Sequence, residues 1–268
     1  MRQPGSFGLH TLAAGLFLLV AAACAPERHR EPRVALLCPS GMAGLLAPLT
    51  EAWTERSGMK VQLAEDSPER ITRQVNGGAP GDLYISAEPR WLTDLITDGH
   101  VNPSETWPLF DDPLVIVTRA QPERPVRHPI DLARPNPLRV ALPEGGWTGR
   151  VGRAALTEAG LWSGVREHLS QPADGPSAIA ALVSGRTEAA ILRRSEAVGA
   201  TTTLTITDWP HSPTTRARVD LALLRTAPHR AEALELARYL TESPEAQAAL
   251  QAAGLGLSAP PRPDFSPG

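Results

Sequence analysis

Small hydroxyl residues and glycines follow several apolar segments of this sequence, at points where helical patterns begin. They are Ser40, Gly41, Ser67, Thr148 and Gly149. The N-terminus of a helix carries unpaired N–H groups and partial positive charge, so it can bind an anion without any basic side chain. A hydroxyl at the same position can instead simply cap its helix. The residues alone leave both interpretations of Ser40 open.

Patterns typical of enzymes and metal sites do not occur in the chain. There is no G-x-S-x-G elbow and no phosphate-binding loop of the G-x-x-x-x-G-K type. Asp111 and Asp112 are adjacent, and neighbours on an extended segment point to opposite faces, so we interpret them as a solvated turn. The histidines after residue 23 are scattered without ligand spacing: His29, His100, His128, His168, His211 and His229. The sequence therefore predicts no catalytic residues, no metal site and no cofactor.

The elements that would position the hydroxyl residues alternate between strand and helix. Apolar or β-branched runs predict strands, and the segments between most of them carry apolar residues on one helical face. The predicted strands are 34–38, 59–66, 81–86, 113–119, 139–144, 188–192, 201–209 and 219–224. This alternation predicts an α/β fold with a mainly parallel sheet. Ligands of such sheets bind beyond the carboxyl ends of the strands, which is where the hydroxyl residues fall.

The first residues predict export. The chain has 268 residues and a formal net charge of −3, so nucleic-acid binding is not expected. The apolar run from Leu12 to Ala23 is typical of a signal peptide over residues 1–23. Cys24 follows small residues, and we expect cleavage before it and lipid attachment to its thiol, with plain secretion as the alternative. Residues 24–33 then form a polar tether, and Cys38 is expected to be a buried thiol without a disulfide partner.

One segment resembles a known family. "QVNGGAPGDLYISAEPRWLTDLITDGHV" is similar to the pattern Q-I-x-x-G-A-P-A-D-[LV]-F-[LI]-S-A-D-x-x-W-M-x-x-L of the molybdate-binding proteins of ABC importers. "PLVIVTR", "LPEGGWTGRVGRAALTEAGLW", "ALVSGRTEAAIL" and "YLTESPEAQAALQAAG" follow in the family's order. The resemblance implies a type II periplasmic-binding-protein fold, in which two α/β lobes close around a hinge cleft. It places lobe 1 at residues 34–113 plus 218–256, lobe 2 at 114–217, and a disordered tail at 257–268.

In that family a tetrahedral oxyanion is held by serine hydroxyls, backbone N–H groups and a tyrosine. Ser40 with Gly41 matches the first serine, and Thr148 with Gly149 matches a backbone-donating turn. Three family positions differ here: the second serine falls at Pro68, an N–H donor falls at Pro176, and the tyrosine falls at Arg193.

Two of these departures leave alternatives open. Ser67, next to Pro68, either replaces the missing serine or only caps its helix. Arg193 either pairs with a carboxylate, phosphate or sulfate of the ligand, or it pairs with Asp66 or Glu144, or it points outward.

The resemblance implies a binding protein that delivers a small oxyanion of the molybdate or tungstate kind to the permease of an ABC importer. With the predicted export and lipid attachment, we expect a lipid-anchored monomer outside the cytoplasm. The alternative is a divergent binding module that serves as a sensor or adaptor, with another anion or no ligand. The loss of donors at Pro68 and Pro176 motivates this alternative.

Overall fold

The computed structural model describes residues 32–200, 203–210 and 212–257. Its strands are β1 (Arg33–Pro39), β2 (Lys60–Asp66), β3 (Leu83–Ser86), β4 (Val101–Arg119), β5 (Val140–Ala141), β6 (Leu169–Ser170), β7 (Ala189–Arg193), β8 (Leu204–Asp208) and β9 (Arg216–Leu224). Its α-helices are α2 (Ala43–Ser57), α3 (Pro68–Asn76), α4 (Pro89–Thr97), α5 (Gly146–Glu158), α6 (Trp162–Val165), α7 (Gly175–Val183), α8 (Arg194–Val198), α9 (Arg230–Glu242) and α10 (Pro244–Ala252). Short 3-10 helices lie at η2 (Pro129–Ala133), η3 (Arg166–His168) and η4 (Pro213–Thr215).

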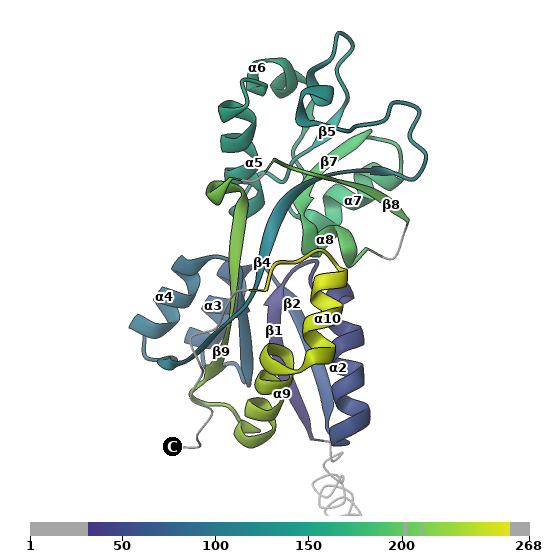
Figure 1. Ribbon diagram of the computed structural model, residues 1–268. Helices are drawn as coiled ribbons and strands as arrows, with labels where there is room; N and C mark the ends of the chain where they lie inside the picture. The colour runs from purple at the N-terminus through teal and green to yellow at the C-terminus, as the bar shows by residue number, and fades with distance from the viewer. Residues whose placement is uncertain (1–31, 201–202, 211, 258–268) are drawn as a thin grey trace, which may run out of the picture. The chain divides into compact units, whose positions relative to one another are not determined.

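The strands run in the order β2-β1-β3-β9-β4-β7-β5-β6, and β8 pairs with β4. The outer strands are parallel, β1 with β2 and β3, and β5 with β6 and β7. The two central strands, β9 and β4, are antiparallel to their neighbours: β9 to β3 and β4, and β4 to β7 and β8 as well. The predicted alternation of strands and helices is confirmed, while the sheet is mixed rather than mainly parallel. Figure 1 shows β4 and β9 running side by side through the middle of the fold.

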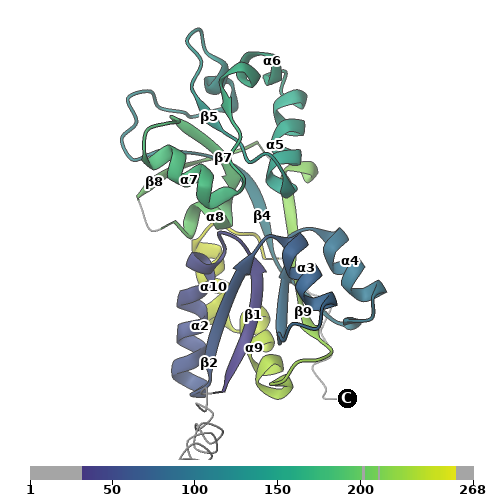
Figure 2. The ribbon, with the colours of Figure 1, turned by 180° about the vertical axis from the view of Figure 1, so that it is seen from behind.

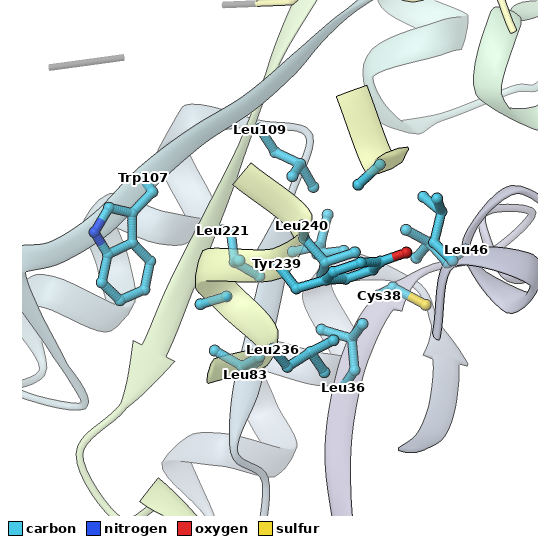
Figure 3. Packing of buried hydrophobic residues seen from close by; sticks show 14 of the residues in the cluster. Leu36, Cys38, Leu46, Leu83, Trp107, Leu109, Leu221, Leu236, Tyr239 and Leu240 are labelled. Carbon is cyan, nitrogen blue, oxygen red and sulfur yellow. The ribbon is translucent and has the colours of Figure 1, made fainter. Parts of the chain in front are cut away.

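Side chains that alternate between the two faces of a strand explain why helices cover both faces of one half of the sheet, β2-β1-β3-β9. Successive side chains on a strand point to opposite faces, so a continuous apolar run buries both. Leu36 and Cys38 of β1 pack in one cluster with residues of α2, α9 and α10, whereas Leu37 packs in another with residues of α3 and α4. Figure 3 shows the first cluster, with Tyr239 of α9 above β1. The two views in Figures 1 and 2 show the two sets of helices on opposite sides of these strands.

The second half of the sheet follows the same rule. Leu114 and Ile116 of β4 pack toward α5 and α6, in a cluster that includes Leu156 and Val165. Val115 and Val117 point the other way and pack with residues of α7, including Leu182. Strand β4 thus contributes its first residues to one half and its last residues to the other.

The structure corrects the interpretation of Asp111-Asp112 as a solvated turn. Strand β4 begins at Val101, twelve residues before the predicted start, and contains both aspartates. Its three prolines hid this strand from the sequence pattern; they are tolerated because β4 is interrupted by register shifts between Val101 and Thr106 and between Pro108 and Phe110. Asp112 is fully buried, with 0% of its surface exposed.

Several predictions lie outside the described residues. They are the signal peptide, lipid attachment at Cys24, most of the tether and nearly all of the C-terminal tail. Within the described part of the chain, no helix has the length and apolar character needed to cross a membrane. Cys38 is a buried free thiol, as expected. The residue limits of the two lobes stay predictions.

Candidate functional site

A cavity of about 300 Å³ lies where the carboxyl ends of β1, β2 and β3 face the N-termini of α5 and α7 and the end of β7. Its walls come from both halves of the sheet. Four residues that the sequence singled out line it together, namely Ser40, Ser67, Thr148 and Arg193. The charged residues that line it are Asp66, Arg70, Glu88, Asp174, Arg193 and Glu196. Sequence reasoning therefore located the cavity but missed most of its charged walls.

The two predicted glycines do not line this cavity. The Gly149 N–H donates to the Gly145 carbonyl at 3.1 Å, inside the first turn of α5. A Cβ atom at Gly149 would lie 2.3 Å from the Pro143 carbonyl oxygen, so this position serves the close turn from β5 into α5. Gly41 has a φ of 88°, which a residue with a side chain rarely adopts, and it packs against Glu196. Both glycines shape the backbone beside the cavity.

The hydroxyl groups at the cavity differ in what they bind. The Ser67 Oγ accepts the Arg70 N–H at 3.3 Å and so caps α3, directly before Pro68 at the first helical position. Ser40 donates its backbone N–H to the Asp66 carbonyl at 3.1 Å. Within the described residues, the hydroxyls of Ser40 and Thr148 have no hydrogen-bond partner. These two hydroxyls, one from each half of the sheet, are free to bind a ligand.

Arg193 is buried. The sequence offered Asp66 or Glu144 as its partner, and the structure shows neither of these pairs. The Arg193 side chain is 7% exposed, and its Nη2 donates to the Glu196 Oε1 at 3.1 Å. The Glu196 Oε2 also accepts the Arg193 backbone N–H at 3.0 Å. A glutamate three residues after a helix N-cap is a known signal for this second bond, and it was present in the sequence. The Arg193 Nε is buried and has no partner within the described residues, and Arg193 is one of the residues that line the cavity.

Behind Arg193 lies a second buried acid. Asp112 of β4 accepts hydrogen bonds from the backbone N–H of Ser195, at 2.9 Å, and from the Ser195 hydroxyl. Burial raises the pKa of Asp112 to about 6, although the charge of Arg193 and the two bonds from Ser195 act in the opposite direction. This aspartate ties the start of α8 to β4, where β4 passes between the two halves of the sheet.

Glu88 connects the two sides of the cavity. It lies between β3 and α4, and its side chain is 5% exposed. Its Oε1 accepts the backbone N–H of Trp147 at 3.0 Å, at the N-terminus of α5, and its Oε2 accepts a bond from Arg150 at 2.6 Å. Sequence reasoning missed this contact, although Glu88 stands where the resembled pattern has Asp. A contact between residues 59 positions apart in the chain has no local signal.

Carboxylates of the protein occupy other helix N-termini near the cavity as well. The Ala43 N–H at the start of α2 donates to the Glu65 Oε1 at 2.7 Å, and the Ser177 N–H of α7 donates to the Asp174 Oδ1 at 2.9 Å. Negative groups are stabilised at these positions by the unpaired N–H groups and the helix dipole. The described residues contain no group of three or more His, Cys, Asp or Glu that could hold a metal ion.

Comparison with known proteins gives consistent results. The sequence pattern of bacterial extracellular solute-binding proteins matches residues 34–256. The chain is 25% identical over 171 residues to the putative ABC transporter substrate-binding lipoprotein YvgL of Bacillus subtilis; this match covers 63% of the chain and 65% of YvgL, slightly under two thirds. It is 22% identical over 177 residues to the molybdate-binding protein ModA of Escherichia coli, covering 63% of the chain and 68% of ModA.

The fold is also found among solved structures. The periplasmic molybdate-binding protein of Azotobacter vinelandii superimposes with a TM-score of 0.72 at 18% identity, covering 85% of this chain and all of that one. The predicted periplasmic-binding-protein fold is thereby confirmed. At this level of identity the similarity establishes the fold and says nothing about which solute is bound.

Proposed function

Because the chain belongs to the bacterial extracellular solute-binding protein family, we propose that it is the solute-binding component of an ABC importer and binds a small anionic solute in the cavity described above. The observation that carries this proposal is the convergence of the buried Arg193 guanidinium with the free hydroxyls of Ser40 and Thr148 on one cavity. The family is defined by solute binding, which agrees with the expectation that the chain is not an enzyme.

The proposed mechanism is closure of two lobes on the solute. We assign residues 34–113 and 218–256 to one lobe and residues 114–217 to the other, with β4 and β9 as the connections. The cavity walls come from both, so a solute bound there contacts both lobes and favours the closed state by its differential affinity. The closed form would then dock on the permease, which is the partner that the proposal requires.

The finer proposal is that the solute is an oxyanion. It is supported by the family pattern around residues 74–101, by the relatives named for molybdate, and by Ser40 at the carboxyl end of β1. For inorganic oxyanions such as molybdate and tungstate, the site lacks two backbone donors, because Pro68 and Pro176 have no N–H. Calorimetric titration with molybdate, tungstate, sulfate, phosphate and organic carboxylates tests the class, and no binding of any anion would refute it.

A serine substitution tests the position of the solute. Ser40→Ala should weaken binding by about 1–3 kcal/mol if the hydroxyl contacts a buried ligand. Ser57→Ala, at the last residue of α2 and away from the cavity, is the matched control. An unchanged affinity in Ser40→Ala would show that this hydroxyl does not contact the solute.

Export and lipid attachment at Cys24 are part of the proposal and rest on the sequence. Metabolic labelling with a radioactive fatty acid, in cells that express the chain or its Cys24→Ala variant, tests the anchor. Label in the chain but not in the variant is expected. Secretion of an unlabelled protein would instead favour cleavage near Ala23.

The second candidate is a sensor or adaptor that uses the same fold. It is favoured by Pro68 and Pro176, which remove two backbone donors of the resembled family. Neighbouring genes for a permease and an ATPase would favour the importer, whereas a neighbouring signalling gene would favour the sensor.

A further inference from the structure

We propose that the solute is a carboxylic acid that also carries hydroxyl or amino groups, rather than a bare tetrahedral oxyanion. This inference rests on the proposed function and narrows the class of anion. Four observations on the cavity support it: its size, the charge of its walls, the state of its helix N-termini, and the donors that remain free.

The first observation is size. The cavity measures about 300 Å³. Small-molecule pockets typically measure about 300–1,000 Å³, so the cavity has the size of a site for an organic solute. A tetrahedral oxyanion, with a central atom and four oxygens, is smaller than the usual occupant of such a site. An organic acid with a substituted carbon chain matches the volume better.

The second observation is the charge of the walls. The carboxylates of Asp66, Glu88, Asp174 and Glu196 line the cavity together with only two guanidinium groups. One of these, Arg70, is 67% exposed and lies 3.6 Å from Asp66. A compact anion placed here would face more negative than positive groups, and like charges nearby disfavour it. A solute that presents N–H or O–H donors to the carboxylates and one negative group to a guanidinium avoids this repulsion.

The third observation concerns the helix N-termini, the usual sites for inorganic oxyanions. Helices α3 and α7 each have proline at the first or second position, which removes a donor, and each has a later N–H bound by its own cap, Ser67 or Asp174. At α5 the Trp147 N–H is bound by Glu88. At each of these helices one first-turn N–H is thus already bound by a side chain of the protein, and α3 and α7 each lack a second donor at their proline.

The fourth observation is what remains. Arg193 lines the cavity and has a planar guanidinium suited to a carboxylate, and of the guanidinium nitrogens only Nη2 binds Glu196. The Ser40 and Thr148 hydroxyls can donate to or accept from hydroxyl groups of the solute. We therefore assign the solute carboxylate to Arg193 and the substituents to these hydroxyls and to the neighbouring carboxylates.

Calorimetry on the exported, processed chain tests the inference. The probes are D-glycerate, D-gluconate, L-serine and L-glutamine, against molybdate, tungstate, sulfate and phosphate. We expect at least one organic probe to bind about 100-fold more tightly than every inorganic anion, because buried polar groups reject ligands that leave them unpaired. For the probe that binds, the analogue without the carboxylate (glucitol for gluconate) and the acid without hydroxyl or amino groups (propionate for glycerate) should both bind at least tenfold more weakly.

The outcomes separate the two levels of proposal. Tighter binding of an inorganic oxyanion would overturn this inference and leave the proposed function intact. Equal binding of the unsubstituted acid would also overturn it, since donors on the solute would be irrelevant. No binding of any probe would overturn both. Mass spectrometry of small molecules released from the purified protein gives an independent answer, and a released ligand without a carboxylate would contradict the inference.

Variants locate the contact. Arg193→Gln should lower the affinity for the organic probe roughly 10- to 100-fold. The matched control is Arg73→Gln, at an exposed arginine of α3 that pairs with Glu69 outside the cavity and should leave affinity unchanged. If Arg193→Gln does not fold, Thr148→Val removes one free hydroxyl at a position that keeps its shape, and it should weaken the substituted acid but not the unsubstituted one. Equal affinities of Thr148→Val and the unaltered chain for both acids would refute the assignment of Thr148.

Discussion

Removal of Glu88 should destabilise the protein, and the size of the effect can be worked out from its contacts. The carboxylate is 5% exposed and binds the Trp147 N–H at 3.0 Å, Arg150 at 2.6 Å and Arg90 at 3.4 Å. A hydrogen bond to a charged group contributes about 1.5–3 kcal/mol. Arg150 and Arg90 are 52% and 57% exposed, so water replaces their partner and each pair adds only about 0–1 kcal/mol. The expected loss in Glu88→Ala is about 3 kcal/mol.

Glu88→Gln separates hydrogen bonding from charge. The amide oxygen can still accept the Trp147 N–H, so the expected loss is about half that of Glu88→Ala. The matched control is Glu69→Gln, because Glu69 is 64% exposed and pairs with Arg73 on the surface of α3; its substitution should change the free energy of unfolding by less than about 1 kcal/mol.

Urea unfolding followed by tryptophan fluorescence measures these differences. With a slope of about 3 kcal/mol per M, a loss of about 3 kcal/mol lowers the midpoint by about 1 M. Because Glu88 lies after β3 and Trp147 lies in the first turn of α5, the contact also joins the two proposed lobes, and Glu88→Ala should weaken solute binding. A midpoint equal to that of the unaltered chain would refute the reasoning, since it would mean that α5 does not need this carboxylate.

Three further predictions concern other parts of the molecule. Burial raises the pKa of Asp112 to about 6, so the folded chain binds this proton more tightly than the unfolded chain does. The free energy of unfolding should therefore fall by up to about 3 kcal/mol as pH rises from about 4 to 6. Asp112→Asn should remove this pH dependence from the urea midpoints, and an unchanged dependence would contradict the assignment. Burial raises the pKa of the Cys38 thiol to about 12, so mass spectrometry should find the Cys38 peptide unmodified by iodoacetamide at pH 8 until the chain is unfolded in urea; alkylation of the folded chain would argue against this burial. A Cβ at Gly44 would lie 1.9 Å from the Gly199 carbonyl oxygen, so Gly44→Ala should lower the thermal midpoint by the equivalent of at least about 1–3 kcal/mol. Gly145→Ala, where a Cβ meets nothing within 4 Å, is the control and should have a smaller effect. Equal midpoints for the two variants would show that α2 and α8 move apart easily.

The sequence was informative wherever a local pattern decides the structure. Apolar runs such as residues 34–38 predicted buried strands, because a strand covered on both faces needs apolar side chains at every position. Ser67 before Pro68 predicted the start of α3, because the cap and the proline act on their own turn of helix. The cavity was placed correctly at the carboxyl ends of the strands, because chain direction alone sets which ends meet there.

Pairing between distant residues was not predictable in this way. Strand β4 continues past Pro103 and Pro108, despite register shifts near both, because β9 pairs with the residues around them, and no local propensity reports such a neighbour. Asp112 was expected in solvent, but its neighbours bury it beside Ser195, 83 positions further along the chain. Burial depends on what the rest of the chain places nearby, and a single segment does not carry that information.

By itself, the sequence predicted most of the strands, the start of α3, the resemblance to a binding-protein family and the hydroxyl residues near the cavity. Only the tertiary structure decided their electrostatics: it buried Arg193 against Glu196 and brought Glu88 to the N-terminus of α5. The physical reason is the range of the interactions. Backbone propensity and side-chain alternation act over a few residues, whereas the charge of a cavity is the sum over side chains from several distant segments.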